Sequence, residues 1–166
     1  MQTRDWLMTD HSLVDDPIES FTDLTDQERT NLAMVFTQLK GWVNQDVDQV
    51  LSVMAEDGVY YDITGEPAVG HDGIREFGDG WIEAVPDFTP YIESICVQGN
   101  KVCDMGRIRG TITKPFYGNP GTGKKFDCQF FQACFIENGK IKYVRDHWNA
   151  ADMYNQVGWD TKSLQR

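Results

Sequence analysis

The chain has 166 residues, of which 40% are hydrophobic and 12% aromatic, and it carries 26 acidic against 15 basic residues. This length fits one domain, and the composition is that of a globular protein with a sizeable core rather than a disordered chain. The net charge of −11 argues against nucleic acid and anionic membrane surfaces as partners, because both require a basic footprint.

Two features indicate the compartment. The first ten residues lack the basic start and the apolar run of a signal peptide, and no apolar stretch approaches the roughly 20 residues of a membrane helix. We therefore expect a cytoplasmic protein. The cysteines have no zinc-like spacing and lie in strand-like runs, which favours reduced thiols used as small hydrophobic side chains, with a cross-strand disulfide or a reactive thiol as the alternative. They are Cys96, Cys103, Cys128 and Cys134.

The N-terminal part predicts an arm followed by two helices. Residues 1–24 are polar and acidic, and we expect a poorly ordered arm whose Trp6 docks onto the body or a second subunit. Thr25 and Glu28 have the spacing of a capping box, and apolar residues follow at helical spacing as far as Trp42. Residues 44–46 break this helix and cap a second one.

The stretch 56–77 carries the first candidate for chemistry. It predicts a strand at 58–64, a Gly/Pro-rich turn at 65–70, and a helix that His71 or Asp72 caps and Pro86 ends. At the end of the strand Asp62 lies among apolar and aromatic neighbours. Aspartate is depleted from strands and is rarely buried without a partner, so this carboxyl is paired, exposed at the strand tip, or used in chemistry.

From residue 87 onward the hydrophobic period is two, which predicts strands at 90–97, 101–112, 125–136 and 139–149. The connection 114–124 is long and rich in Gly and Pro, and we expect it to overhang the mouth of a cavity. The order of elements predicts an α+β fold, a cone-shaped curved antiparallel sheet packed on three N-terminal helices. One domain would span 25–158, followed by a tail at 159–166, and the cone would hold an apolar ligand.

Several segments resemble a known superfamily. They are Asp57-Gly-Val-Tyr-Tyr-Asp-x-x-Gly-Glu-Pro67, Gly70-x-x-Gly-Ile-Arg-Glu-Phe77, Pro86-Asp-Phe88, and the stretches 120–124, 137–141 and 147–158. Together they resemble the nuclear-transport-factor-two-like superfamily over roughly residues 26–158, and the chain is most similar there to SnoaL-like polyketide cyclases. The resemblance implies the α+β cone.

Two other branches of the superfamily place individual residues. Asp62 falls where ketosteroid isomerases carry their catalytic base, but Gln38 and Phe131 hold the positions of that family's oxyanion donors, which argues against a steroid isomerase. The resemblance to limonene-epoxide hydrolases puts Asp146 on their catalytic acid/base position, and Tyr60 and Asp62 where a water nucleophile is held.

Two departures from these families concern the reaction. The Arg-x-Asp motif of limonene-epoxide hydrolases is Arg107-Ile108-Arg109 here, so a guanidinium replaces a carboxylate. SnoaL-like cyclases usually have Glu-His-Trp-Asp where this chain has Asp146-His147-Trp148-Asn149, so an amide replaces the last acid.

The resulting hypothesis is a cofactor-free acid/base enzyme of secondary metabolism that acts on a hydrophobic small molecule by cyclisation, isomerisation or dehydration. Epoxide opening and a non-catalytic ligand-binding or dimerisation module are the alternatives. No metal or cofactor motif is visible. The candidate catalytic residues are Asp62, Asp146 and His147. The candidate substrate contacts are Tyr60, Gln38, Arg107, Phe131, Trp148, Asn149 and Trp81.

Structural roles for the two acids stay open. Asp62 could bond backbone N–H groups of the following turn, and Asp146 could pair with a nearby arginine. Asp146 also shares its nominal strand face with Lys140 and Lys142, which would turn it outward unless a bulge intervenes. We further expect a homodimer, because the outer sheet face is rich in phenylalanine.

Overall fold

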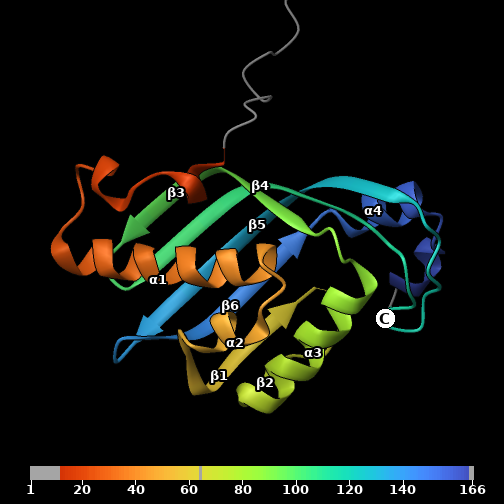
Figure 1. Ribbon diagram of the computed structural model, residues 1–166, viewed down its shortest axis with the longest axis horizontal. Coiled ribbons are helices and arrows are strands. Elements are labelled where there is room, and N and C mark those ends of the chain that lie inside the picture. Colours follow the sequence, from red (N-terminus) through yellow and green to blue (C-terminus); the bar gives the residue numbers. More distant parts are fainter. Residues whose placement is uncertain (1–11, 64, 165–166) are drawn as a thin grey trace, which may run out of the picture.

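The computed structural model describes residues 12–63 and 65–164. They form a mixed α+β fold in which a curved six-stranded sheet, in the order β2-β1-β6-β5-β4-β3, carries helices on one face (Figure 1). The strands are β1 Met54–Asp62, β2 Ala68–Val69, β3 Thr89–Gln98, β4 Lys101–Thr111, β5 Lys125–Glu137 and β6 Lys140–Trp148. The α-helices are α1 Asp26–Val43, α2 Val47–Leu51, α3 Gly70–Ala84 and α4 Ala150–Val157. The predicted fold class is confirmed.

The capping signals decide where the first helices begin. At α1 the predicted capping box is present, since Thr25 Oγ1 accepts from the Glu28 amide at 3.3 Å and Glu28 accepts from the Thr25 amide at 3.0 Å. The predicted caps of α3 are wrong. This helix already begins at Gly70, so His71 and Asp72 lie in its first turn. Gly70 has a φ of +71°, a conformation that would be strained in a residue with a side chain.

The four predicted C-terminal strands form the antiparallel part of the sheet, and each ends within two residues of its expected bounds. β1 starts earlier than predicted and pairs with β6 in parallel. No hairpin joins these two strands, so no tight turn imposes the antiparallel direction. The parallel register places Asp62 directly beside Asp146.

A bulge in β6 settles which face its residues occupy. The register between β5 and β6 shifts by one residue at Lys142, because Ile136 lies opposite Ile141 and Phe135 lies opposite Tyr143. Ile141 is fully buried before the bulge, and beyond it the alternation reverses. Val144 is then buried, and Asp146 faces the helices.

Residues on both sides of the expected domain belong to the packed body. Val14 is buried, and the Ser12 hydroxyl accepts from the backbone amide of Ile92 at 2.9 Å. Residues 12–24 are therefore no loose arm, and residues 1–11, with Trp6, lie outside the described residues. Trp159, in the expected tail, is 7% exposed and packs edge-on against Tyr154. Its large ring gives this segment a place in the core.

Helix α4 was not predicted. The Asn149 side chain caps it by accepting from the Asp152 amide at 3.1 Å, and Gly158 ends it with a φ of +80°. This cap occupies the Asn149 side chain that we expected to contact substrate.

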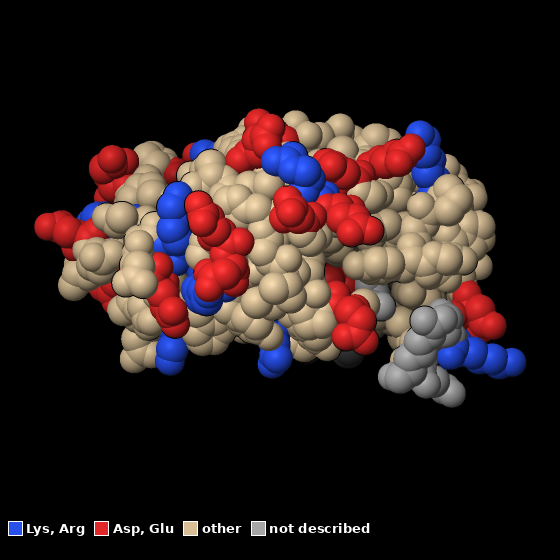
Figure 2. Space-filling model, turned by 90° about the horizontal axis from the view of Figure 1, so that it is seen from below, with Lys and Arg blue, Asp and Glu red and all other residues tan. Residues whose placement is uncertain are grey.

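The surface has little continuous positive charge on the face seen in Figure 2, where lysine and arginine side chains are scattered among acidic ones. Within the described part of the chain, no helix has both the length and the apolar character of a membrane span.

Candidate active site

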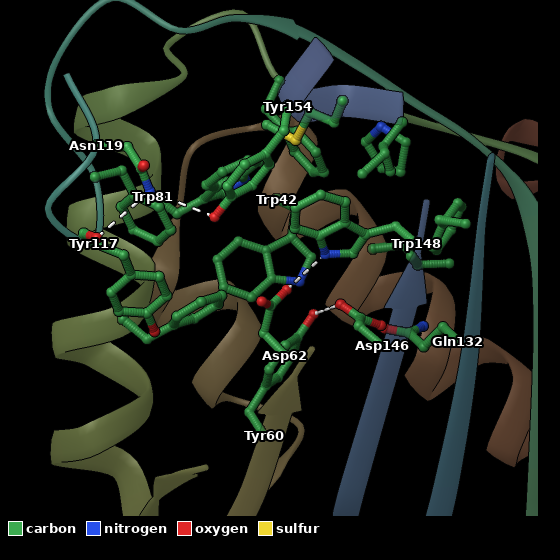
Figure 3. Close-up of a pocket in the computed structure, with 18 of the residues that line it drawn as sticks. Trp42, Tyr60, Asp62, Trp81, Tyr117, Asn119, Gln132, Asp146, Trp148 and Tyr154 are labelled. Carbon is green, nitrogen blue, oxygen red and sulfur yellow. Dashed lines mark hydrogen bonds between the residues drawn. The ribbon is translucent and has the colours of Figure 1, made fainter. Parts of the chain in front are cut away.

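A cavity between the sheet and the helices is walled mostly by aromatic rings (Figure 3). The rings come from α1, β1, α3, the segment before β3, the loop between β4 and β5, β5, β6, α4 and the segment after it. They are Trp42, Tyr60, Phe77, Trp81, Phe88, Phe116, Tyr117, Phe130, Trp148, Tyr154 and Trp159. The space open to the centres of water molecules is about 50 Å³. This is room for water or a very small molecule, and it lies well below the roughly 300 Å³ at which sites for drug-sized ligands begin.

Two carboxyl groups lie side by side at the sheet wall of this cavity. Asp62 on β1 and Asp146 on β6 are register partners on neighbouring parallel strands, which run about 4.8 Å apart, and both line the cavity. Their hydrogen bonds differ, as Figure 3 shows: Asp62 Oδ2 accepts from the Trp148 indole N–H at 2.9 Å, and Asp146 Oδ2 accepts from the Tyr60 hydroxyl.

The surroundings of Asp146 favour its protonated form. Burial raises the pKa of Asp146 well above its ordinary value, and the negative charges of Asp62 and Asp104 raise it further, while the hydrogen bond from Tyr60 opposes them. Its Oδ1 is buried and has no hydrogen-bond partner among the described residues. Burial and the charge of Asp146 also raise the pKa of Tyr60, so this phenol stays protonated.

A third acid, Asp104 on β4, lies in the same row of the sheet and was missed from the sequence. The register aligns Asp62, Asp146, Gln132 and Asp104 across four strands. Asp104 is 2% exposed, its Oδ2 accepts from the Gln132 amide at 3.0 Å, and burial raises its pKa to about 7. The signal for it was a lone acid among the inward-facing positions of β4, whose other members are small or apolar.

Gln38 supports this row without lining the cavity. It is fully buried in α1, and its amide exchanges hydrogen bonds with that of Gln132 at 3.2 and 3.3 Å. Its predicted contact with substrate is therefore replaced by a contact with the sheet, which fixes the orientation of the Gln132 amide beside Asp104.

Five of the predicted residues contact the cavity. Asp62, Asp146, Tyr60, Trp148 and Trp81 all line the cavity.

Besides Gln38, four predicted residues are not at the cavity. Arg107 points to the outer face of the sheet, where its Nε lies 2.5 Å from the Asp127 carboxylate. Phe131 and His147 are exposed register partners on that same face, and Asn149 caps α4. Strand alternation explains the correction, since these side chains have the opposite parity to the inward row.

The loop between β4 and β5 covers the cavity, as expected from its length. The Phe116 ring packs against Phe77 and Trp81 at centroid distances of 6.2 and 5.1 Å. Burial and the charge of Asp62 raise the pKa of the neighbouring Tyr117 to about 12. The Trp159 indole N–H donates to a carbonyl of the same loop at 2.7 Å. This loop therefore forms one wall of the cavity.

The inventory of groups permits proton transfer. Among residues 12–63 and 65–164, no group of three histidine, cysteine or carboxylate side chains is placed to hold a metal. The cavity offers a carboxyl whose surroundings favour its protonated form, a second carboxyl beside it, and mostly apolar walls. Such a pair can divide into a proton donor and a base.

Comparisons with known proteins give the family. Similar solved structures include a protein from Jannaschia sp. CCS1 named for its likeness to SnoaL polyketide cyclases, with 17% identity over 82% of this chain and 96% of that one and a TM-score of 0.75. TsrD from Streptomyces laurentii has 18% identity, coverage of 82% and 98%, and a TM-score of 0.70. TerC, which was co-crystallised with polyporic acid, has 18% identity, coverage of 78% and 98%, and a TM-score of 0.67.

At these identities the solved structures establish the fold alone. No curated protein matches the sequence. The family model of the SnoaL-like polyketide cyclases, however, matches residues 33–157. This range includes α3, the long strands and the row formed by Asp62, Asp146, Gln132 and Asp104. The chain therefore belongs to the SnoaL-like polyketide cyclase family.

Proposed function

We propose that this protein is a cofactor-free acid/base enzyme of secondary metabolism that acts on a hydrophobic small molecule by cyclisation, isomerisation or dehydration. One observation carries the proposal: two carboxyl groups with different hydrogen-bond partners are register neighbours in one aromatic cavity. Family membership supports a cyclase-type role.

The two acids take different parts in this scheme. Asp62 removes a proton from a carbon atom of the substrate, and Asp146, which its surroundings keep protonated, gives its proton to a substrate oxygen. The Trp148 indole orients Asp62, and the Tyr60 hydroxyl orients Asp146. Since one proton is taken as another is given, the bound substrate keeps its net charge, and no separate oxyanion hole is required.

The proposed ligand is larger than the closed cavity. Because the cavity is lined mostly by rings, we propose that a compound with apolar rings enters it; TerC, which has the same fold, was co-crystallised with polyporic acid. The loop that carries Phe116 and Tyr117 would open for such a compound, because these rings close the cavity toward α3.

Exchange of carbon-bound hydrogen tests the proposed roles without the natural substrate. We would follow the α-protons of a cyclic ketone in D₂O by NMR, with the wild-type protein and its Asp62→Asn and Asp146→Asn variants. Each well-placed group contributes about 10²–10⁴-fold, so each variant should lose acceleration by that order.

The matched control is His147→Gln, which changes an exposed side chain on the outer face of the sheet. It should exchange at the wild-type rate. Full exchange activity in Asp62→Asn would overturn the assignment of the base. No acceleration by the wild-type protein with any of several ketones would favour the non-catalytic binding module.

Epoxide opening receives no comparable support. The Arg107 and Arg109 pair, which replaces the hydrolase motif, lies on the outer face of the sheet and binds Asp127. Neither guanidinium lines the cavity.

A further inference from the structure

The ionisable carboxyl groups in the cavity wall have no basic counterpart there in the part of the chain that the structure describes. The described residues that line the cavity bring the carboxyls of Asp62 and Asp146 and no lysine, arginine or histidine. The guanidinium groups of Arg107 and Arg109 on β4 lie on the outer face of the sheet and pair there with Asp127. Among the described residues, no positive side chain therefore lines the cavity to balance a negatively charged ligand.

The aromatic wall adds to this preference. The rings form one connected cluster: Tyr60 stacks on Phe77 with centroids 5.3 Å apart, and Phe77 in turn meets Trp42 and Phe116 at 6.1 and 6.2 Å. The face of each ring carries negative electrostatic potential. Such faces attract cations within about 6 Å, most strongly where water is excluded.

The negative charge of Asp62 extends to the loop side of the cavity, because it contributes to the raised pKa of Tyr117. The Tyr117 ring lies 6.4 Å from Phe77 and is 49% exposed, so it stands at the rim. A positive group entering beneath this loop would lie near Asp62 and among aromatic rings.

We propose that the cavity binds a compact organic cation, a tertiary or quaternary ammonium group that forms part of the substrate. The proposal rests on the proposed function in placing this group in the same cavity. The closed cavity has room only for a compact group such as trimethylammonium, so this group would be the part of the substrate held there. The positive charge would also stabilise the electron density left when Asp62 removes a proton from an adjacent carbon.

A pair of probes with the same shape separates charge from fit. Choline and 3,3-dimethyl-1-butanol differ in that a neutral carbon replaces the quaternary nitrogen. Titration of the full-length protein, followed by calorimetry and by methyl-group NMR of the probes, should show choline binding about tenfold or more tightly than the alcohol.

Two variants locate the effect. Asp62→Asn removes the charge and Tyr117→Leu removes a ring at the rim, and each should lower the affinity for choline severalfold while that for the alcohol changes little. Tyr117 is half exposed, so this variant is expected to fold. The control is Phe131→Leu, which removes an exposed ring from the outer face and should leave both affinities unchanged.

Equal affinities for the two probes would overturn the proposal, as would a preference for choline that survives both variants. Binding of neither probe would count against it in the same way. Because the ketone used in the exchange assay is neutral, exchange can succeed while the preference for a cation fails. Conversely, choline can bind to a protein that exchanges no protons.

Discussion

The buried carboxyl of Asp104 should make the stability of the protein depend on pH. Its pKa is raised from 3.8 to about 7, because burial removes the carboxylate from water and Gln132 supplies a single opposing hydrogen bond. In the pH range between these values the folded state holds a proton that the unfolded state has lost. The free energy of unfolding should therefore fall as the pH rises from about 4 to 7, by about 4 kcal/mol at most, at about 1.36 kcal/mol for each unit of pKa.

Replacing Asp104 with asparagine removes this ionisation. The amide oxygen can still accept from Gln132, but the amide nitrogen takes the place of Oδ1, which is buried and has no partner among the described residues. An unsatisfied buried donor costs about 1–3 kcal/mol. At pH 4.5 the wild type has already lost about 1 kcal/mol of this stability, so Asp104→Asn should be less stable by about 0–2 kcal/mol there and more stable by about 1–3 kcal/mol at pH 8.

Urea unfolding followed by circular dichroism between pH 4.5 and 8 measures the difference. Asp146 adds a pH dependence of the same direction, but it is present in both proteins and largely cancels. Thr22→Ser, at an exposed position in a turn, changes no ionisable group and is the control, which should differ from wild type by the same amount at every pH. If the difference for Asp104→Asn also kept one sign and size throughout, the raised pKa of Asp104 would be refuted.

Three further predictions concern packing, capping and assembly. Gly106→Ala should destabilise the protein by about 3 kcal/mol in thermal or urea unfolding, because an added Cβ would lie 1.8 Å from the Tyr91 carbonyl oxygen. Gly80→Ala, in helix α3 with only ordinary contacts nearby, should instead stabilise by about 0.5–1 kcal/mol, and a loss of stability there would contradict the packing. Thr25→Ala should lose about 1 kcal/mol with the capping box, and an unchanged midpoint would show that the box adds nothing. We expect a homodimer through the outer sheet face, where Phe131 is 41% exposed, so Phe131→Asp should sediment as a monomer; a monomeric wild type at micromolar concentration would contradict this.

Most elements of the fold could be predicted from local sequence patterns. The capping box at Thr25, the period-two strands and the turn glycines each depend on residues a few positions apart, and the elements they predicted are present. The two-residue strand β2 was missed because it is too short to show a period. Helix α4 was missed because the polar residues around Asn149 were assigned to a substrate site rather than to a cap.

The candidate site could be predicted only in part, because it depends on register. Asp62 stood out as an acid in an aromatic strand, but the direction of Asp146 turned on the bulge at Lys142, which shows only in the pairing with β5. Asp104 went unnoticed, since its importance comes from lying in one row with Gln132 on the next strand. Such rows join residues tens of positions apart, and no local pattern reports them.

The distribution of tryptophan gives this molecule a built-in optical probe. Of its five tryptophans, Trp42, Trp81, Trp148 and Trp159 line the cavity, and the fifth lies outside the described residues. The Trp148 indole is hydrogen-bonded to the carboxylate of Asp62, so its emission depends on that charge and on nearby water. Intrinsic fluorescence should therefore shift when a ligand displaces water from the cavity, when the loop over it opens, or when Asp62 is neutralised. Site occupancy can then be read in real time on unlabelled protein.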